Sequence, residues 1–383
     1  MTLATLFVLA AAQTLHYHGE LPDEAHAWCV HDLNRPNPVK VTADEGKVPS
    51  DAIVLFDGTE ESVRKNWCDK EGKPTKWKSD NGRLVCVPGS GYIFTKEHFG
   101  DVQLHIEWMA PADEPGEGQG RGNSGVYLGN RYELQILESY GTNPADMKNP
   151  NYADGQASAL YGQHPPLANP ARPEGVWQSY DIVYHPALWE NGVRVHPATV
   201  TAFFNGVLVH DQWELDGPTD WVIRSTPTNL PYCGPLALQD HGHPVPFRNI
   251  WIRKILSRWA DKSHGGCAMD AIEVAKQRVR NGAAIFAKIE PGVIDFVNAE
   301  RAMEAVAYDP DGGYQAKMYE ICDAFAKKID GYTAKDLSDP GLRDDVICIG
   351  RLCGLMARKG WMKADCALAV AVEAAKKRVP KSK

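Results

Sequence analysis

The sequence predicts a mainly β protein in which a two-sheet antiparallel sandwich, residues 51–256, is followed by a small all-helical domain, residues 257–383. Short runs of alternating apolar and polar residues, separated by Gly, Pro, Asn and Asp, fill the first region and are typical of half-buried strands. After Leu256 apolar residues recur at intervals of three and four, which indicates helices. The chain of 383 residues, 43% hydrophobic and 23% charged, is also long and apolar enough for two folded domains.

The clearest strands are predicted where polarity alternates with a period of two. They cover residues 102–108, 178–184, 199–209 and 249–253. Asn205 and Gly206 divide the third run into a hairpin, because Asn-Gly is a preferred pair for a two-residue turn. Helices are predicted at residues 268–279, 314–326 and 344–359.

Residues 1–20 are predicted to be a signal peptide, because the apolar run 3–12 has the right length and ends in small residues. The run is too short to span a bilayer. No Lys or Arg precedes it, which leaves a buried N-terminal strand as the alternative. We therefore expect an exported protein, periplasmic or extracellular, in which residues 21–50 form an arm that leads into the sandwich.

The net charge of −8 argues against nucleic acid or an anionic membrane as the main partner, since both bind clusters of Lys and Arg. A basic stretch occurs only at residues 375–383, where a solvated helix end explains it. The nine cysteines form no Cys-x-x-Cys pair and no zinc-site spacing.

The cysteines divide into two groups. Those expected to be small buried hydrophobic residues of helices are Cys267, Cys322, Cys348, Cys353 and Cys366. Those that could supply a disulfide in an oxidising compartment are Cys29, Cys68, Cys86 and Cys233.

A polar row is predicted on one face of the strand that contains the sequence RYELQILESY. Side chains alternate between the two faces of a strand, so Arg131, Glu133 and Gln135 point one way while the apolar residues between them point into the core. A β-bulge near Leu137 would bring Glu138 back beside Gln135. A polar row of this kind suits the face of a sandwich that binds sugar.

The spacing of Glu133, Gln135 and Glu138 is similar to the Glu-x-Asp-x-x-Glu signature of one jelly-roll glucanase family. In that signature a nucleophile, a helper Asp and an acid/base group lie along one strand. Gln135 replaces the helper, and an amide cannot share a proton or tune the pKa of its neighbours as a carboxylate does. The alternative is that both glutamates are only surface or hydrogen-bonding groups.

A second polar cluster follows the apolar residues 236–238. If the strand stays regular, Gln239 and His241 face the same open side as the first row. His241 is the group best suited to exchange a proton near neutral pH. Asp240 is expected to orient it or to bind a metal. A structural histidine at a strand end is the alternative.

The glycine-rich stretch 116–125 formally contains the dinucleotide fingerprint Gly-x-Gly-x-x-Gly. That fingerprint requires a helix after the glycines, whereas a β-like sequence follows here. We interpret the stretch as a loop that enters a strand, with Arg121 and Asn123 as candidates to face a ligand. No Gly-x-Ser-x-Gly elbow is present, so serine-based acyl transfer is not expected.

Several motifs in order along residues 51–255 resemble the 3-keto-disaccharide hydrolase family. They are Leu55-Phe56-Asp57-Gly58, residues 122–128, residues 131–140, Trp177-Gln178-Ser179-Tyr180-Asp181-Ile182, residues 205–209, Leu238-Gln239-Asp240-His241-Gly242 and residues 247–253. The resemblance implies a concanavalin A-like jelly-roll fold and hydrolysis of glycosides that carry a ketone at C3. Many members of the family are exported. The helical region lies outside the resemblance.

The implied chemistry explains why the glucanase-like motif is incomplete. A ketone at C3 acidifies the proton on C2, so the group at C1 can leave through an enolate, after which water adds. Such a site needs a base, an electrophile for the enolate oxygen and a proton donor for the leaving group.

We assign these roles to the two polar clusters as a hypothesis. His241 is the candidate base, Glu133 or Glu138 the candidate acid, and the carbonyl and hydroxyl partners are Arg131, Gln135 and Gln239. A divalent metal held by His241 with Glu133 or Asp240 is the alternative electrophile, and no other cofactor is expected. Candidates to stack on a pyranose are Trp177, Tyr127 and Tyr140, although sandwiches also bury such residues.

Two other functions compete with this hypothesis. An ordinary glycoside hydrolase of the glucanase type would place the carboxyl groups of Glu133 and Glu138 about 5 Å apart if retaining, or about 6.5 to 9.5 Å apart if inverting. A non-catalytic carbohydrate-binding module would bind glycans without turnover. All three hypotheses make carbohydrate the partner.

Overall fold

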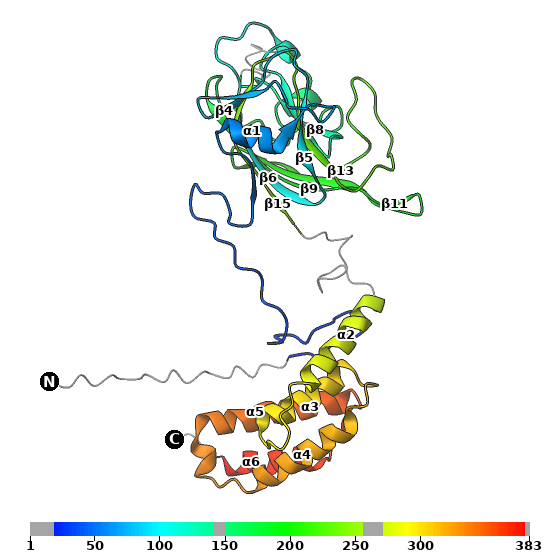
Figure 1. Ribbon diagram of the computed structural model, residues 1–383. Coiled ribbons are helices and arrows are strands. Elements are labelled where there is room, and N and C mark those ends of the chain that lie inside the picture. The colour runs from blue at the N-terminus through cyan, green and yellow to red at the C-terminus, as the bar shows by residue number, and fades with distance from the viewer. Residues whose placement is uncertain (1–18, 141–150, 256–270, 380–383) are drawn as a thin grey trace, which may run out of the picture. The chain divides into compact units, whose positions relative to one another are not determined.

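The structure is a computed structural model that describes residues 19–140, 151–255 and 271–379. These residues form two compact units, which we call the β unit, from residue 39 to residue 255, and the helical unit, residues 19–38 with 271–379 (Figure 1). Almost all of the predicted signal peptide lies outside the described residues, as does Cys267, so export stays a prediction.

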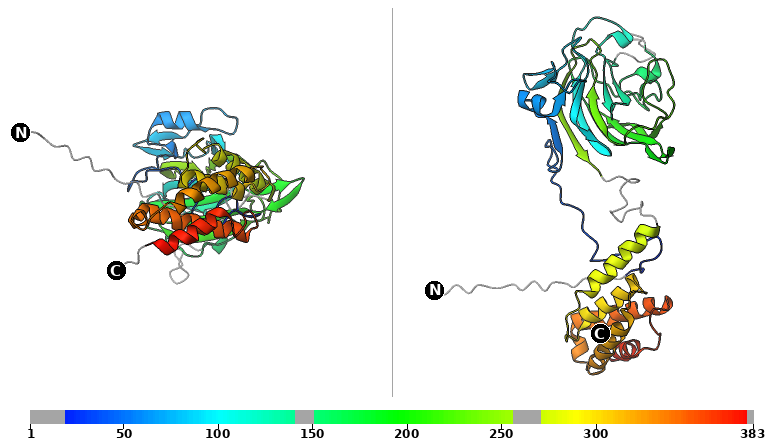
Figure 2. Two further views of the ribbon diagram at one scale, coloured as in Figure 1. Left: turned by 90° about the horizontal axis from the view of Figure 1, so that it is seen from below. Right: turned by 45° about the vertical axis from the view of Figure 1, so that its right-hand side comes forward.

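The β unit is a sandwich of two antiparallel sheets, as predicted (Figure 2). The larger sheet has the order β13-β12-β9-β6-β15-β4-β3, and β1 pairs with β15. Its strands are β1 Ile53–Phe56, β3 Lys78–Asp80, β4 Arg83–Val85, β6 Val102–Met109, β9 Trp177–His185, β12 Ala198–Phe204, β13 Val207–Leu215 and β15 Pro246–Lys254.

The smaller sheet has five strands in the order β2-β5-β14-β7-β8. These are β2 Trp67–Cys68, β5 Ile93–Phe99, β14 Gly234–Leu238, β7 Ser124–Leu128 and β8 Tyr132–Ile136. Two short strands, β10 Leu188–Glu190 and β11 Val193–His196, form a separate hairpin, and one helix, α1 Glu60–Asn66, follows β1.

Alternating polarity determines which side chains fill the space between the sheets. Along β6 buried and half-buried residues alternate without interruption, and in β8 Leu134 and Ile136 belong to the core. The predicted hairpin is confirmed, since Asn205 (φ 50°) and Gly206 (φ 80°) join β12 to β13 with the positive φ values of a tight turn.

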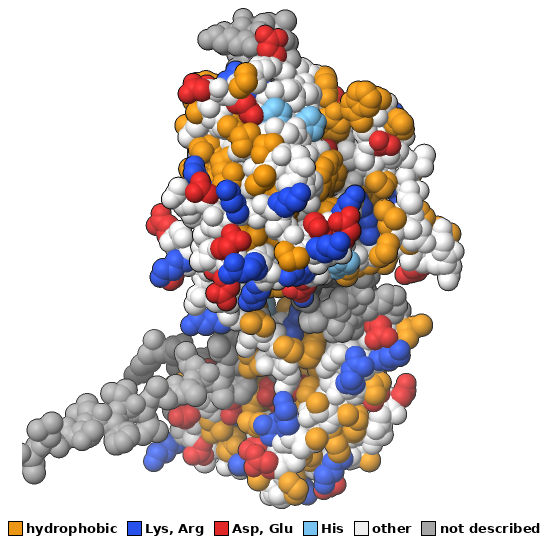
Figure 3. All heavy atoms as spheres, turned by 45° about the horizontal axis from the view of Figure 1, so that its top comes forward, with side chains coloured by type: hydrophobic (Ala, Val, Ile, Leu, Met, Phe, Trp, Pro, Cys, Tyr) orange, Lys and Arg blue, Asp and Glu red, His pale blue; other side chains and the backbone are white. Residues whose placement is uncertain are grey.

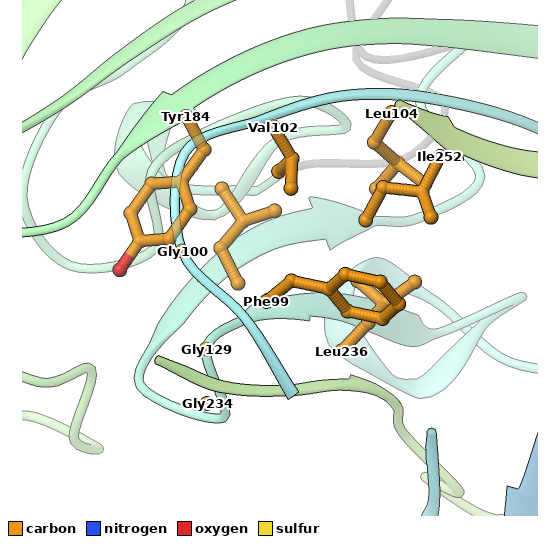
Figure 4. A pocket seen from close by; sticks show the side chains of 10 residues that line it. Phe99, Gly100, Val102, Leu104, Gly129, Tyr184, Gly234, Leu236 and Ile252 are labelled. Atoms are coloured by element: carbon orange, nitrogen blue, oxygen red, sulfur yellow. The ribbon is translucent and has the colours of Figure 1, made fainter. Parts of the chain in front are cut away.

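The interior of the sandwich is closed to ligands. Figure 4 shows a cavity lined by side chains such as Phe99, Leu104, Leu236 and Ile252. Its volume is only about 10 Å³, which is about the space that one water molecule needs. A ligand site must therefore lie outside the core.

The helical unit consists of helices that pack on one another around a second core (Figure 2). They are α2 Ala271–Phe286, α3 Phe296–Tyr308, α4 Gln315–Asp330, α5 Pro340–Arg358 and α6 Ala367–Arg378. Helices α2, α4 and α5 coincide with the three predicted helical runs. None of the described helices is both long enough and apolar enough to cross a membrane.

The N-terminal segment 19–38 packs on these helices, whereas the sequence predicts that residues 21–50 form an arm that leads into the sandwich. Leu21 and Cys29 belong to the core of the helical unit. The Cys29 backbone N–H donates to Tyr308 Oη at 3.1 Å, which ties the segment to α3.

The cysteines within the described residues are free thiols. The suggested disulfide among Cys29, Cys68, Cys86 and Cys233 is therefore not formed. Cys322, Cys353 and Cys366 are buried as expected, whereas Cys348 is half-buried.

Candidate functional site

A cavity of about 310 Å³ lies on the outer face of the five-stranded sheet. Strands β7 and β8, the end of β14 and several loops contribute its lining. The lining residues are Tyr92, Gln119, Asn123, Tyr127, Glu133, Gln135, Tyr161, Thr219, Asp220, Trp221, Gln239 and His241. Because Leu134 and Ile136 point into the core, Glu133 and Gln135 must point to the opposite side of the strand. The cavity thus unites the two polar clusters of the sequence.

The pairing of β7 with β8 brings Tyr127 and Glu133 together. They are cross-strand partners, and Tyr127 Oη donates to Glu133 Oε2 at 2.8 Å. Gly125, also on β7, makes room for this carboxylate, because a Cβ atom at position 125 would lie only 2.2 Å from Glu133 Oε1. The last glycine of the stretch 116–125 therefore provides space for an acidic group.

Glu133 is a buried carboxyl group that titrates near neutral pH. Its side chain is only 4% exposed, and this burial raises its pKa from 4.5 to about 7, against the lowering effect of the Tyr127 hydrogen bond. With its amide nitrogen turned toward Glu133, Gln135 donates to Glu133 Oε1 at 3.2 Å and to the Ser124 carbonyl at 3.0 Å. At neutral pH Glu133 can therefore either give up or take up a proton.

Gln239 lies at the centre of a second group of hydrogen bonds. Its backbone N–H donates to the Gly125 carbonyl at 3.0 Å, which extends the contact between β14 and β7. Its side-chain amide donates to Tyr92 Oη at 2.7 Å and lies 3.4 Å from Tyr127 Oη. The phenol and carboxyl groups of the cavity are thus linked.

Two buried acceptors of the cavity have no hydrogen-bond partner among the described residues. They are Asn123 Oδ1 and Gln239 Oε1. Asn123 is only 1% exposed, and its amide nitrogen donates to the Gln119 carbonyl at 2.8 Å, which fixes its orientation. Buried acceptors normally find a donor, and the hydroxyl groups of a sugar would supply one to each.

His241 lies in the turn after β14, on the same cavity as Glu133. Partial burial lowers the pKa of its imidazole below 6.5, and the neighbouring His243 lowers it further. The two rings are nearly parallel, with centroids 5.9 Å apart. The imidazole of His241 is therefore neutral at pH 7 and able to accept a proton.

Asp240 holds the turn and does not line the cavity. Its Oδ2 accepts from the Gly91 N–H at 2.8 Å, and its Oδ1 accepts from the Gly242 N–H at 2.9 Å. Within the described ranges, no three His, Cys, Asp or Glu side chains gather as a metal site would require. The alternative in which His241 holds a divalent metal with Glu133 or Asp240 involves only two of these side chains and stays a prediction.

Glu138 is separated from the cavity lining. The bulge expected near Leu137 is absent, because β8 pairs regularly with β7 as far as Ile136 and then ends. Glu138 Oε1 accepts from the Tyr140 N–H at 2.9 Å, and Oε2 lies 4.0 Å from Arg121 Nε. The predicted row is thus reduced to Glu133 and Gln135.

The two arginines with predicted ligand roles make contacts within the protein instead. Arg131 precedes β8, and its guanidinium donates to the Pro231 carbonyl. Arg121 forms an ion pair with Glu174. Neither residue lines the cavity, so the anticipated arginine electrophile is missing from it.

Only one of the three aromatic residues predicted to stack on a sugar lines the cavity. Tyr127 lines the cavity, but the ring of Trp177 on the larger sheet lies under the Arg248 guanidinium, 4.1 Å from it. Tyr140 is 57% exposed and lies outside the lining. Trp221 is the tryptophan that the cavity contains.

Sequence reasoning missed the lining residues that come from loops. They are Tyr92, Gln119, Tyr161, Thr219, Asp220 and Trp221. Trp221 carried the one usable signal, since it lies in a Gly-, Pro- and Asp-containing stretch and binding residues are disproportionately found on loops.

Residues 51–253 match the model of a family described as the 3-keto-alpha-glucoside-1,2-lyase-like domain. The chain belongs to this family. The resemblance found in the sequence is thereby confirmed. Membership in the 3-keto-alpha-glucoside-1,2-lyase-like family supports a carbohydrate-active enzyme of the hydrolase or lyase type.

The chain is similar to two solved structures, of which the first supports this placement. One from Parabacteroides distasonis, described as a "putative glycosyl hydrolase", is 37% identical, with a TM-score of 0.53 over 59% of this chain and 95% of that one. A second from the same organism, with the same description, is 18% identical, with a TM-score of 0.40 over 54% of this chain and 94% of that one. A search of curated proteins found no significant match.

Proposed function

We propose that the protein cleaves 3-keto-glycosides by eliminating the group at C1 and then hydrating the product. The observation that carries this proposal is that Glu133 and His241 line one cavity with pKa values displaced in opposite directions. The glutamic acid tends to keep its proton and the imidazole tends to be without one. An elimination needs an acid and a base in these two states.

The reaction proceeds in two stages. A base removes the C2 proton, and the electron pair forms an enolate with the C3 carbonyl. The enolate then expels the C1 substituent, whose oxygen takes a proton, and leaves a double bond between C1 and C2. This expulsion restores the C3 ketone, and water then adds across the C1–C2 bond, with hydroxide at C1 and a proton at C2.

His241 is the base in this scheme and Glu133 the proton donor to the leaving group. Tyr92, which accepts a hydrogen bond from Gln239, is the phenol assigned to donate to the enolate oxygen. Asn123 Oδ1 and Gln239 Oε1 accept from sugar hydroxyls. Each role uses a residue of the lining.

An ordinary glycoside hydrolase of the glucanase type has less support. That mechanism needs two carboxyl groups on opposite sides of one glycosidic bond. Glu138, the partner expected for Glu133, is not a lining residue, and the other carboxyl group of the lining, that of Asp220, accepts from the Trp221 backbone N–H at 2.7 Å. A non-catalytic binding module would require no proton donor or acceptor in the cavity.

The test is to incubate the pure protein with a phenyl glucoside and with its 3-keto form, with and without chelator, and to measure phenol release. Release from the 3-keto form alone is expected. His241→Ala should lower turnover at least about a hundredfold. The matched control is His98→Ala, an exposed histidine outside the cavity, which should behave as wild type. Release from the unoxidised glycoside would favour the ordinary hydrolase, and near-normal turnover of His241→Ala would exclude this base.

A further inference from the structure

The loop between β13 and β14 carries three consecutive apolar side chains in water beside the cavity. Trp221 lines the cavity and is 70% exposed, and the next two residues, Val222 and Ile223, are 80% and 61% exposed. Figure 3 shows hydrophobic side chains gathered on the surface of the β unit among charged ones. Large apolar side chains that are left together at the surface are typical of ligand or partner sites.

The loop is attached to the strand that holds the candidate acid. The Glu133 N–H donates to Thr219 Oγ1 at 2.9 Å, and the Thr219 N–H donates to the Arg131 carbonyl at 2.7 Å. At the base of the loop Gly217 approaches Thr226 so closely that a Cβ atom at position 217 would lie 2.4 Å from the Thr226 carbonyl oxygen. These contacts anchor the base of the loop that carries Trp221 to the strand that carries Glu133.

The backbone at the tip of this loop is strained. Val222 has φ 53°, in the left-handed region, which is unfavourable for a β-branched residue. Strain of this kind clusters at ligand-binding positions. The tip therefore carries two free-energy costs, the strained backbone of Val222 and the exposure of three apolar side chains to water. A ligand that covers the three side chains would offset the cost of their exposure.

The chemistry of the cavity indicates which part of a glycoside lies there. Polar groups of β7, β8 and β14 line its floor, and its volume of about 310 Å³ suits one sugar ring. The substituent at C1 must then project toward the rim. The side chains of Trp221, Val222 and Ile223 are apolar and offer only one hydrogen-bond donor, the indole N–H, for the many hydroxyls of a second sugar.

We propose that Trp221, Val222 and Ile223 form a leaving-group subsite that favours glycosides with an aromatic aglycone over those with a small or polar one. This inference rests on the proposed function, since it assumes a glycoside in the cavity. The aromatic ring stacks on the indole of Trp221, and Val222 and Ile223 flank it.

The test compares release from the 3-keto forms of a phenyl and a methyl glucoside, as the ratio of the two kcat/KM values. Trp221→Ala should lower the phenyl-to-methyl ratio about three- to tenfold, which is the range of one aromatic contact. Trp221→Phe should keep most of the ratio. The control Val193→Ala removes an exposed apolar side chain of the separate β10–β11 hairpin and should leave the ratio unchanged. Equal ratios in wild type and Trp221→Ala would overturn the subsite.

A binding measurement separates this inference from the proposed reaction. If wild type releases no aglycone from any 3-keto-glycoside, the proposed function fails. Calorimetry with phenyl 1-thio-glucoside then decides on the subsite. Weaker binding to Trp221→Ala than to wild type supports it, and equal binding, or none to either protein, overturns it.

Discussion

The two faces of the five-stranded sheet show how the same strands carry different tasks. On the inner face Val126 and Leu134 have no exposed surface and pack into the core. On the outer face their neighbours Tyr127 and Glu133 line the cavity and bond to each other at 2.8 Å. Consecutive residues of each strand therefore face either the apolar core or the cavity with its titratable groups.

The difference teaches that the outer face is organised for chemistry at the expense of stability. The core residues gain free energy from burial. In contrast, Glu133 is buried in a site that disfavours its charge, and the acceptors Asn123 Oδ1 and Gln239 Oε1 lack partners among the residues described. Substitutions on the two faces should therefore change different properties.

The largest effect is expected from Glu133→Gln. The amide keeps the shape of the side chain but cannot donate a proton to the leaving group, so kcat on a 3-keto-glycoside should fall by about 10² to 10⁴. The matched control is Glu138→Gln, a glutamate two residues beyond the end of β8 that lies outside the cavity lining and should retain most activity. Equal losses in both variants would mean that the site extends beyond the end of β8.

The inner face should respond in stability. Leu134→Ala removes a fully buried side chain from the core, and should lower the free energy of unfolding by about 2 to 5 kcal/mol. Tyr127→Phe, on the other face of the sheet, should lower it by about 1 to 3 kcal/mol, because the ring is kept but the buried Glu133 loses a hydrogen-bond donor. Urea unfolding followed by tryptophan fluorescence measures both. A larger loss in Tyr127→Phe than in Leu134→Ala would reverse the comparison.

The smallest effect concerns pH and the stability of the outer face. The pKa of Glu133 is raised from 4.5 to about 7, so folding favours its protonated form. Below pH 4.5 the group is protonated in both folded and unfolded chains, and its full stabilising contribution to the free energy of unfolding is present. As pH rises through 7 this contribution is lost, by up to about 3 kcal/mol.

Glu133→Gln cannot ionise and therefore escapes this loss. We expect the variant to be more stable than wild type by about 1 to 3 kcal/mol at pH 8 and to match it at pH 4.5. Thermal unfolding of both proteins across this pH range gives the comparison. A variant that is less stable at pH 8 would show that the ionised carboxylate is favoured by its neighbours.

Alternation made much of the β unit predictable. Local sequence preferences predict the alternating polarity of β6, β9 and β15. They also predict the hairpin at Asn205 and Gly206, and the fold preserves these local preferences. In the helical region α3 and α6 were not anticipated. α6 is rich in alanine, which weakens the contrast between the faces of a helix, whereas α3 has as clear a contrast as α4 and could have been predicted.

The site was predictable where strands supply it and unpredictable where loops do. Glu133, Gln135, Gln239 and His241 follow from the side that each residue takes along its strand. Trp221 depends on how a long loop folds back, and the exclusion of Glu138 depends on where β8 stops. Long-range contacts decide both, and no local pattern encodes them.

Residues 158–161, which follow the 3-10 helix Ala153–Gly155, form hydrogen bonds with the outer edge of β8. Ser158 and Tyr161 donate backbone N–H groups to the Gln135 and Glu133 carbonyls at 2.8 and 3.1 Å, and Gln135 donates in turn to Ala159 at 2.9 Å. Since β8 is the terminal strand of its sheet, these bonds occupy the edge that a strand of another molecule could otherwise join. The carboxylate-bearing strand is thus shielded from aggregation by its own chain.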